Sequence, residues 1–126
     1  MAKLKMIMVV DDNETDQFLN EVIIEKFDPS IQVVKMYDGQ EALDYFSRNE
    51  PIPDIVFLDI NMPGMNGFQF LEQFDASIAP SIKIFMLSSS EQDDDKKKAL
   101  SYDVVKEYLP KPMCFIGLEA LIERHF

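Results

Sequence analysis

The sequence predicts a doubly wound α/β sandwich, in which helices cover both faces of a central sheet of five parallel strands. Strand-like stretches alternate along the chain with stretches whose apolar residues recur at the helical period of 3.6 residues. Several of the strand-like stretches are nearly continuous apolar runs, which is typical of parallel strands buried on both faces. With 126 residues, the chain has the length of one domain, which we take to span residues 1–126.

The first part of the chain is expected to form two strand–helix units. A strand is expected over residues 5–10 and a helix over about 14–27, with one apolar face formed by Phe18, Leu19, Val22, Ile23 and Phe27. A second strand is expected over residues 31–37. Asp38 and Glu41 then have the spacing of a capping box, which predicts that a second helix begins there. The buried stripe of that helix is expected to consist of Ala42, Leu43 and Phe46.

Three further units follow. A strand over residues 54–59 precedes a helix that opens at Gly67 and carries Phe68, Leu71 and Phe74. A strand over residues 82–87 precedes a fourth helix that Ser90 and Asp93 can cap. In residues 93–98 three acids come before three lysines, an order that the helix dipole favours. The fifth strand is expected over residues 104–109, and the last helix is marked by Phe115, Leu118, Leu121 and Ile122.

Composition narrows the class of protein. A net charge of -11 argues against nucleic acid and anionic membranes as partners, and it suits a divalent cation or a basic protein partner. No apolar run approaches the roughly 20 residues of a membrane span, and no signal peptide is visible before the first strand. The single cysteine, Cys114, suits a reducing compartment, so we expect a cytoplasmic protein. We expect Cys114 to pack as a small apolar residue and His125 to be exposed at the end of the last helix.

Polar residues gather at the carboxyl ends of the predicted strands. Asp11 and Asp12 follow the first strand, Asp59 ends the third, Ser88 follows the fourth and Lys111 follows the fifth. Taken singly, they could be helix caps, a turn former, a common strand-end serine and a surface lysine. In open parallel sheets, however, ligands bind in the crevice beyond these strand ends. The coincidence of all of them in one alternating pattern therefore predicts a functional site.

The residue types indicate magnesium and phosphoryl chemistry. Mg2+ prefers about six oxygen ligands and usually keeps several waters. Three protein oxygens are candidates for direct ligands, from the carboxylates of Asp12 and Asp59 and the backbone carbonyl of Asn61. Asp11 would hold a metal-bound water. An Asp carboxylate such as that of Asp59 can attack phosphorus to give an aspartyl phosphate, while Lys111 neutralises charge and Ser88 offers a hydroxyl to a phosphoryl oxygen.

Over essentially its whole length, the chain resembles the receiver domain of two-component response regulators, which has the flavodoxin-like fold of the chemotaxis regulator. The resemblance rests on the Asp11-Asp12 pair, the run FLDINMPGMNG over residues 57–67, Ser88, and the Lys111-Pro112 pair. It implies that Asp59 accepts a phosphoryl group from a histidine of a sensor histidine kinase or phosphotransfer protein. Such a chain is a signalling phosphoacceptor rather than an enzyme, apart from intrinsic autophosphorylation and autodephosphorylation.

The resemblance also implies roles for the remaining residues. The ligands of Mg2+ would come from Asp11, Asp12, Asp59 and the Asn61 carbonyl. Lys111 would bond the phosphoryl group, and its peptide bond to Pro112 would be cis. Ser88 would reorient toward the phosphoryl group while Tyr108 turns inward, so that a downstream partner reads the face built by the fourth helix, fifth strand and fifth helix. The chain would be either a single-domain regulator or a receiver excised from a longer protein.

Three other functions are less compatible with the sequence. A phosphatase of the haloacid dehalogenase type needs a second Asp two residues after the nucleophile, where this chain has Asn61. A flavodoxin needs a neutral phosphate-binding loop after the first strand, where residues 11–14 are mostly acidic. An interaction scaffold with a dead site is disfavoured because the acids and Lys111 are all present.

Overall fold

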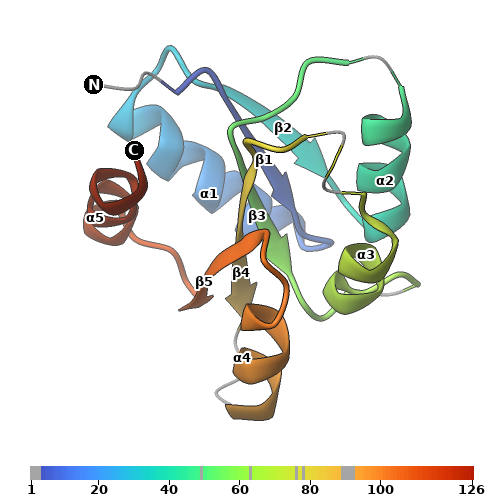
Figure 1. Cartoon of the computed structure of the whole chain (residues 1–126). Helices are drawn as coiled ribbons and strands as arrows, with labels where there is room; N and C mark the ends of the chain where they lie inside the picture. The colour runs from blue at the N-terminus through green and yellow to red at the C-terminus, as the bar shows by residue number, and fades with distance from the viewer. Residues whose placement is uncertain (1–3, 49, 63, 76, 78, 89–92) are drawn as a thin grey trace.

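The computed structural model describes residues 4–48, 50–62, 64–75, 77, 79–88 and 93–126. It contains one sheet with the strand order β2-β1-β3-β4-β5, and all neighbouring strands are parallel (Figure 1). The strands are β1 (Met6–Val10), β2 (Gln32–Met36), β3 (Ile55–Asp59), β4 (Lys83–Ser88) and β5 (Val105–Pro110). Almost every residue of β1, β3 and β4 is buried, as their apolar runs predict, whereas the edge strands β2 and β5 are partly open to solvent.

Among the described residues each strand is followed by a helix, so the predicted doubly wound fold is confirmed. The helices are α1 (Glu14–Phe27), α2 (Gly39–Ser47), α3 (Gly67–Gln73), α4 (Asp93–Leu100) and α5 (Phe115–His125). Side chains of α1 and α5 pack on one face of the sheet, and those of α2, α3 and α4 pack on the other (Figure 1). Among the described residues, no helix combines the length and apolar character that crossing a membrane requires.

The apolar face predicted for α1 is only partly the face that the helix buries, since Ile23 and Phe27 pack against the core but the other three residues do not. Phe18, Leu19 and Val22 are 60%, 45% and 44% exposed, and the buried residues of α1 are Gln17, Asn20 and Ile24. The side-chain amide of Gln17 gives a physical reason. Its Nε2 lies 2.8–3.0 Å from three backbone carbonyls at the strand ends, those of Val9, Asp11 and Met36. These hydrogen bonds turn the helix so that a polar residue faces the sheet.

The capping of α2 differs from expectation, and the cap predicted at Ser90 lies outside the described residues. Asp38 accepts from the backbone N–H of Glu41 at 2.7 Å, but the Glu41 carboxylate lies 3.4 Å from the backbone nitrogen of Tyr37, so the predicted capping box is only half formed. A complete capping box occurs instead at α3, where Asn66 and Gln69 each accept a backbone N–H from the other. That box holds the start of the helix that follows β3.

The expected surroundings of Cys114 and His125 were both wrong. Cys114 is exposed at the start of α5, where its Sγ accepts from the backbone N–H of Gly117 at 3.3 Å. His125 is only partly exposed, because its ring packs edge-on against Phe85 and its Nε2 lies 2.6 Å from a carboxylate oxygen of Glu107. The neighbours that cover His125 lie on β4 and β5, and residue type and helical period do not reveal them.

Candidate functional site

The two innermost acids lie together because of the strand pairing. Val10 of β1 is the register partner of Leu58 of β3. Asp11 and Asp59 are the next residues after these two, so they lie at the same edge of the sheet. The strand order reverses direction between β1 and β3, which is where open α/β sheets form their ligand crevices. Asp11 and Asp59 are 1% and 5% exposed, whereas Asp12 faces solvent.

These three acids form a compact cluster. One carboxylate oxygen from each of Asp11, Asp12 and Asp59 lies within 4.8 Å of the others. Carboxylate oxygens are the ligands that magnesium prefers, and one or two carboxylates are its usual protein share. The donor set therefore fits such an ion. Asn61, whose carbonyl was predicted as a further ligand, lies just beyond β3, and its backbone N–H donates to the Asp59 carboxyl group.

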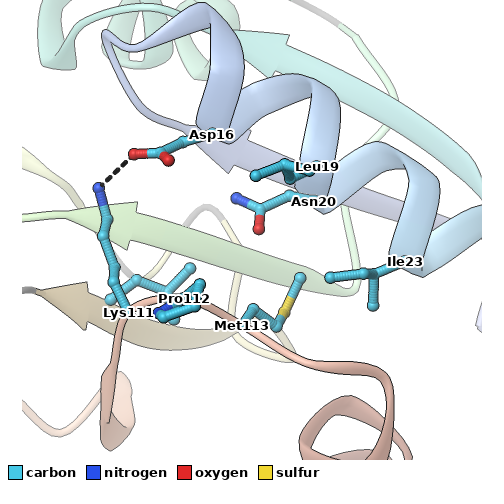
Figure 2. A pocket seen from close by; sticks show the side chains of 8 residues that line it. Asp16, Leu19, Asn20, Ile23, Lys111, Pro112 and Met113 are labelled. Atoms are coloured by element: carbon cyan, nitrogen blue, oxygen red, sulfur yellow. Dashed lines mark hydrogen bonds and ion pairs between the residues drawn. The ribbon is translucent and has the colours of Figure 1, made fainter.

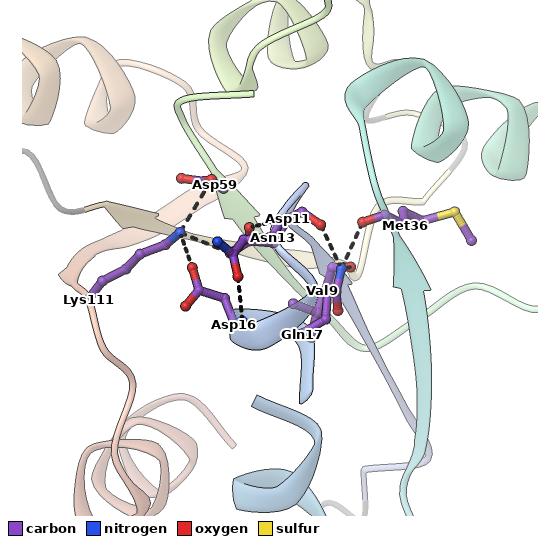
Figure 3. A network of polar contacts seen from close by, with 8 residues as sticks. All are labelled: Val9, Asp11, Asn13, Asp16, Gln17, Met36, Asp59 and Lys111. Carbon is purple, nitrogen blue, oxygen red and sulfur yellow. Dashed lines mark hydrogen bonds and ion pairs between the residues drawn. The ribbon is translucent and has the colours of Figure 1, made fainter. Parts of the chain in front are cut away.

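Lys111 reaches into this cluster from the end of β5. Its Nζ lies 2.9 Å from Asp11 Oδ2, 3.1 Å from Asp16 Oδ2 and 3.3 Å from Asp59 Oδ2 (Figure 3). The lysine is held in place by its backbone N–H, which donates to the carbonyl of Ser88 at 2.9 Å. The Lys111–Pro112 peptide bond is cis, as the resemblance implied. The contact with Asp16 was missed from the sequence, where nothing distinguishes this acid from others at a helix start.

Burial and charge shift the titration of the central pair. Burial raises the pKa of Asp59 to about 6, and the Asp11 charge adds to that rise, while Lys111 and the backbone N–H of Asn61 act against it. Burial alone would lower the pKa of Lys111, but its hydrogen bond to Asp11 and the nearby carboxylates outweigh burial and raise it. Lys111 therefore keeps its positive charge, and the raised pKa makes the charge of Asp59 depend on pH near neutrality.

The backbone around Asp59 is packed tightly. A Cβ atom added at Gly67 would lie 2.6 Å from the carbonyl oxygen of Asp59 and 3.1 Å from the Cα of Ile60. The backbone N–H of Gly67 also donates to the carbonyl of Ile60 at 3.0 Å. A residue without a side chain is therefore needed where α3 begins, and this close approach holds the end of β3 against the helix.

Ser88 and Tyr108 stand on neighbouring strands. Tyr108 is the register partner of Met86, and Ser88 lies two residues beyond Met86 on β4. Because side chains alternate along a strand, Ser88 and Tyr108 project from the same face of the sheet. Ser88 is buried, and the half-buried ring of Tyr108 packs against the core beneath α2, α3 and α4.

Comparisons with known proteins agree with this geometry. The family described as response regulator receiver domain matches residues 7–123. Protein PilH of Pseudomonas aeruginosa is 32% identical over 108 residues, covering 85% of each chain. The probable methanogenesis regulatory protein FilR2 of Methanothrix harundinacea is 31% identical over 123 residues, which covers 94% of this chain and 79% of that protein. A two-component response regulator from Cytophaga hutchinsonii superposes with a TM-score of 0.84 at 27% identity, over 98% of this chain and 97% of that one.

Proposed function

We propose, because this chain belongs to the response regulator receiver domain family, that Asp59 is its phosphoacceptor and that magnesium binds beside it. The chain is a receiver domain of two-component signalling. The single observation that carries the residue assignment is the position of Asp59. It is buried at the end of β3, 3.3 Å from the ammonium of Lys111 and clustered with two further carboxylates.

The proposed reaction transfers a phosphoryl group from a phosphorylated histidine of a sensor kinase or phosphotransfer protein. A carboxylate oxygen of Asp59 attacks the phosphorus, a P–O bond forms, and the P–N bond breaks with its electron pair returning to the imidazole. Lys111 neutralises negative charge on the transferred oxygens, and the Ser88 hydroxyl donates to one of them. Asp59 must be ionised to attack, and with a pKa of about 6 it is mostly ionised at pH 7.

The residues proposed to hold magnesium are Asp12 and Asp59 directly, the carbonyl of Asn61, and Asp11 through water. When bound, the ion would supply positive charge that offsets the carboxylates and the phosphoryl oxygens. Receiver domains are signalling phosphoacceptors rather than classical enzymes. We propose that, besides accepting a phosphoryl group from its partner, this site performs only self-phosphorylation and self-dephosphorylation. The reduced thiol of Cys114 suits the cytoplasm, where we expect the protein to act.

The test is phosphorylation with acetyl phosphate and magnesium, followed by intact mass measurement. The wild type should gain one phosphate, and Asp59→Asn should gain none. Asp44→Asn makes the same chemical change on the exposed face of α2 and serves as the matched control, which should still be phosphorylated. Equal incorporation into the Asp59→Asn and wild-type chains would refute the assignment.

We further propose that a downstream protein reads the phosphorylation state on the face formed by α4, β5 and α5. A phosphoryl group on Asp59 would draw the Ser88 hydroxyl toward it, and the ring of Tyr108 would move into the space that opens. Charge-assisted bonds would thereby bias a two-state element. The side chains of Ser88 and Tyr108 share one face of the sheet on adjacent strands, and this supports the coupling.

Backbone amide NMR with and without beryllofluoride, a phosphoryl mimic, tests this readout. In the wild type, resonances of α4 and around Tyr108 should shift together with those around Asp59. Ser88→Ala should still bind the mimic yet lose the shifts around Tyr108. Shifts confined to the loops around Asp11, Asp59 and Lys111 in the wild type would contradict the proposed switch.

A further inference from the structure

Asp16 is a third carboxylate on the site lysine, in addition to the acids assigned above. It lies in the first turn of α1, where its backbone N–H is capped by Asn13, and its Oδ2 accepts from Lys111 Nζ at 3.1 Å (Figure 2). Lys111 donates at 2.9 Å to Asp11 and at 3.1 Å to Asp16, while Asp59 is the farthest of the three at 3.3 Å. An ammonium has three protons to donate, so in this state two of them are committed away from Asp59.

We propose that Asp16 is a positioning residue that holds Lys111 in the unphosphorylated state. It thereby weakens the interaction of Lys111 with a phosphoryl group at Asp59. The proposal rests on the proposed function of Asp59 as phosphoacceptor. It assigns Asp16 a regulatory role in the same reaction: phosphorylation has to compete with α1 for the lysine.

Charge gives the direction of the effect. A phosphoryl group on Asp59 adds negative charge to a cluster that already contains Asp11 and Asp12. Asp16 competes for the ammonium of Lys111 and also repels the incoming charge, so both effects disfavour the phosphorylated state. Neutralising Asp16 removes both at once. Lys111 keeps its place, because Asp11 still accepts from it at 2.9 Å and its backbone N–H remains bound to the strand end.

Exposure sets the size of the effect. The Asp16 side chain is 36% exposed and that of Lys111 is 19% exposed, so water screens part of their attraction. Pairs of this kind are typically worth a few tenths to 1 kcal/mol, which corresponds to about a two- to fivefold change in an equilibrium constant. Asp16 should therefore tune the affinity of the site for a phosphoryl group rather than abolish it.

The position of Asp16 also predicts a structural signature. Asp16 and Lys111 lie at one end of a cavity of about 130 Å³ between α1 and the loop that joins β5 to α5, with Asn20 and Met113 further along it (Figure 2). If a phosphoryl group draws Lys111 away, the carboxylate of Asp16 loses its hydrogen bond and turns to water. The carboxyl carbon resonance of Asp16 should shift when the site is filled, although Asp16 does not belong to the cluster of Asp11, Asp12 and Asp59.

The decisive experiment titrates beryllofluoride, with magnesium in excess, into the wild type, Asp16→Asn, Asp16→Glu and Glu14→Gln, with half-saturation followed by NMR. Glu14 is an exposed acid in the same helical turn, so Glu14→Gln makes the same change in net charge and helix dipole. Among the described residues, however, Lys111 forms an ion pair with Asp16 and none with Glu14. Asp16→Asn should lower the half-saturating concentration about two- to fivefold.

Glu14→Gln should stay close to the wild type, and Asp16→Glu should restore most of the wild-type value because it restores the charge. Equal half-saturation in Asp16→Asn and Glu14→Gln would overturn the proposal, because the effect would then belong to net charge. Weaker binding by Asp16→Asn would also overturn it. A wild type that binds no beryllofluoride would instead refute the function proposed for Asp59, and this outcome is distinguishable from the other two.

Discussion

Replacing Asp59 by Asn should make the metal-free protein more stable at neutral pH, although it removes the proposed phosphoacceptor. Asp59 is 5% exposed, and burial raises its pKa from 3.8 to about 6. The folded state therefore prefers the neutral carboxyl group more than the unfolded state does. Asn resembles that neutral form in shape, and the other acids that hold Lys111, Asp11 and Asp16, stay in place.

The magnitude follows from the pKa shift. Each unit corresponds to 1.36 kcal/mol, so an ionised Asp59 costs the folded state about 3 kcal/mol at pH 7. Between about pH 4 and pH 6 the folded state binds more protons at Asp59 than the unfolded state does, so stability falls as pH rises through this window. The cost is complete above it and absent below it. For a chain of this length, about 3 kcal/mol corresponds to a rise in Tm on the order of 10 °C.

Urea and thermal unfolding in EDTA, at several pH values between 4 and 8, measure this difference. The free energy of unfolding of Asp59→Asn should exceed that of the wild type by the full amount of about 3 kcal/mol at pH 7. The two values should approach each other near pH 4. Asp12→Asn is the matched control, since it removes one charge from the same cluster at an exposed position and should change stability little. Magnesium should narrow the gap, because it is expected to stabilise the wild type more than the variant.

An Asp59→Asn variant that is no more stable than the wild type at pH 7 in EDTA would refute the reasoning. So would a gain of equal size at pH 4 and pH 7, because it would have a cause other than the charge of Asp59.

Three further outcomes are expected. Magnesium should stabilise the wild type by about 2.7 kcal/mol at a hundredfold excess over Kd, and Asp12→Ala should lose most of the corresponding rise in Tm. If millimolar magnesium leaves the Tm of the wild type unchanged, the proposed metal site is wrong. Gly67→Ala should lower stability to urea by about 1–3 kcal/mol, because its Cβ would lie 2.6 Å from the last carbonyl of β3; an unchanged midpoint would show that α3 can move aside. Burial alone would raise the pKa of Glu107, but hydrogen bonds from His125 and Arg124 outweigh burial and lower it. Glu107→Gln should therefore reduce Tm at neutral pH and lose this effect in acid, as pH falls through the pKa of the folded carboxyl group; a loss that persists in acid would show that these charges are not its source.

Local sequence pattern was sufficient for the fold and for most of the site. Strands buried on both faces are continuous apolar runs, and surface helices carry the 3.6-residue period, so their alternation alone predicts a parallel α/β sheet. Parallel strands bring their carboxyl ends to one edge. The acids at positions 11, 12 and 59 and the lysine at position 111 therefore had to meet there, and the structure brings them together.

Local pattern failed where a contact from elsewhere in the chain outweighs residue type. The apolar face of α1 is partly exposed because the amide of Gln17 binds carbonyls of β1, β2 and the loop between β1 and α1. His125 is partly covered because it meets Phe85 and Glu107, which lie on other elements.

By itself, the sequence determined which elements form, their parallel arrangement and the strand ends at which charge collects, because these depend on periodicity and chain order. Only the tertiary structure decided how α1 is rotated and which charges pair. Asp16 and Lys111 are 95 residues apart, and their pairing depends on the angle at which α1 meets the sheet. That angle is set by hydrogen bonds and packing between distant segments, and no local pattern encodes it.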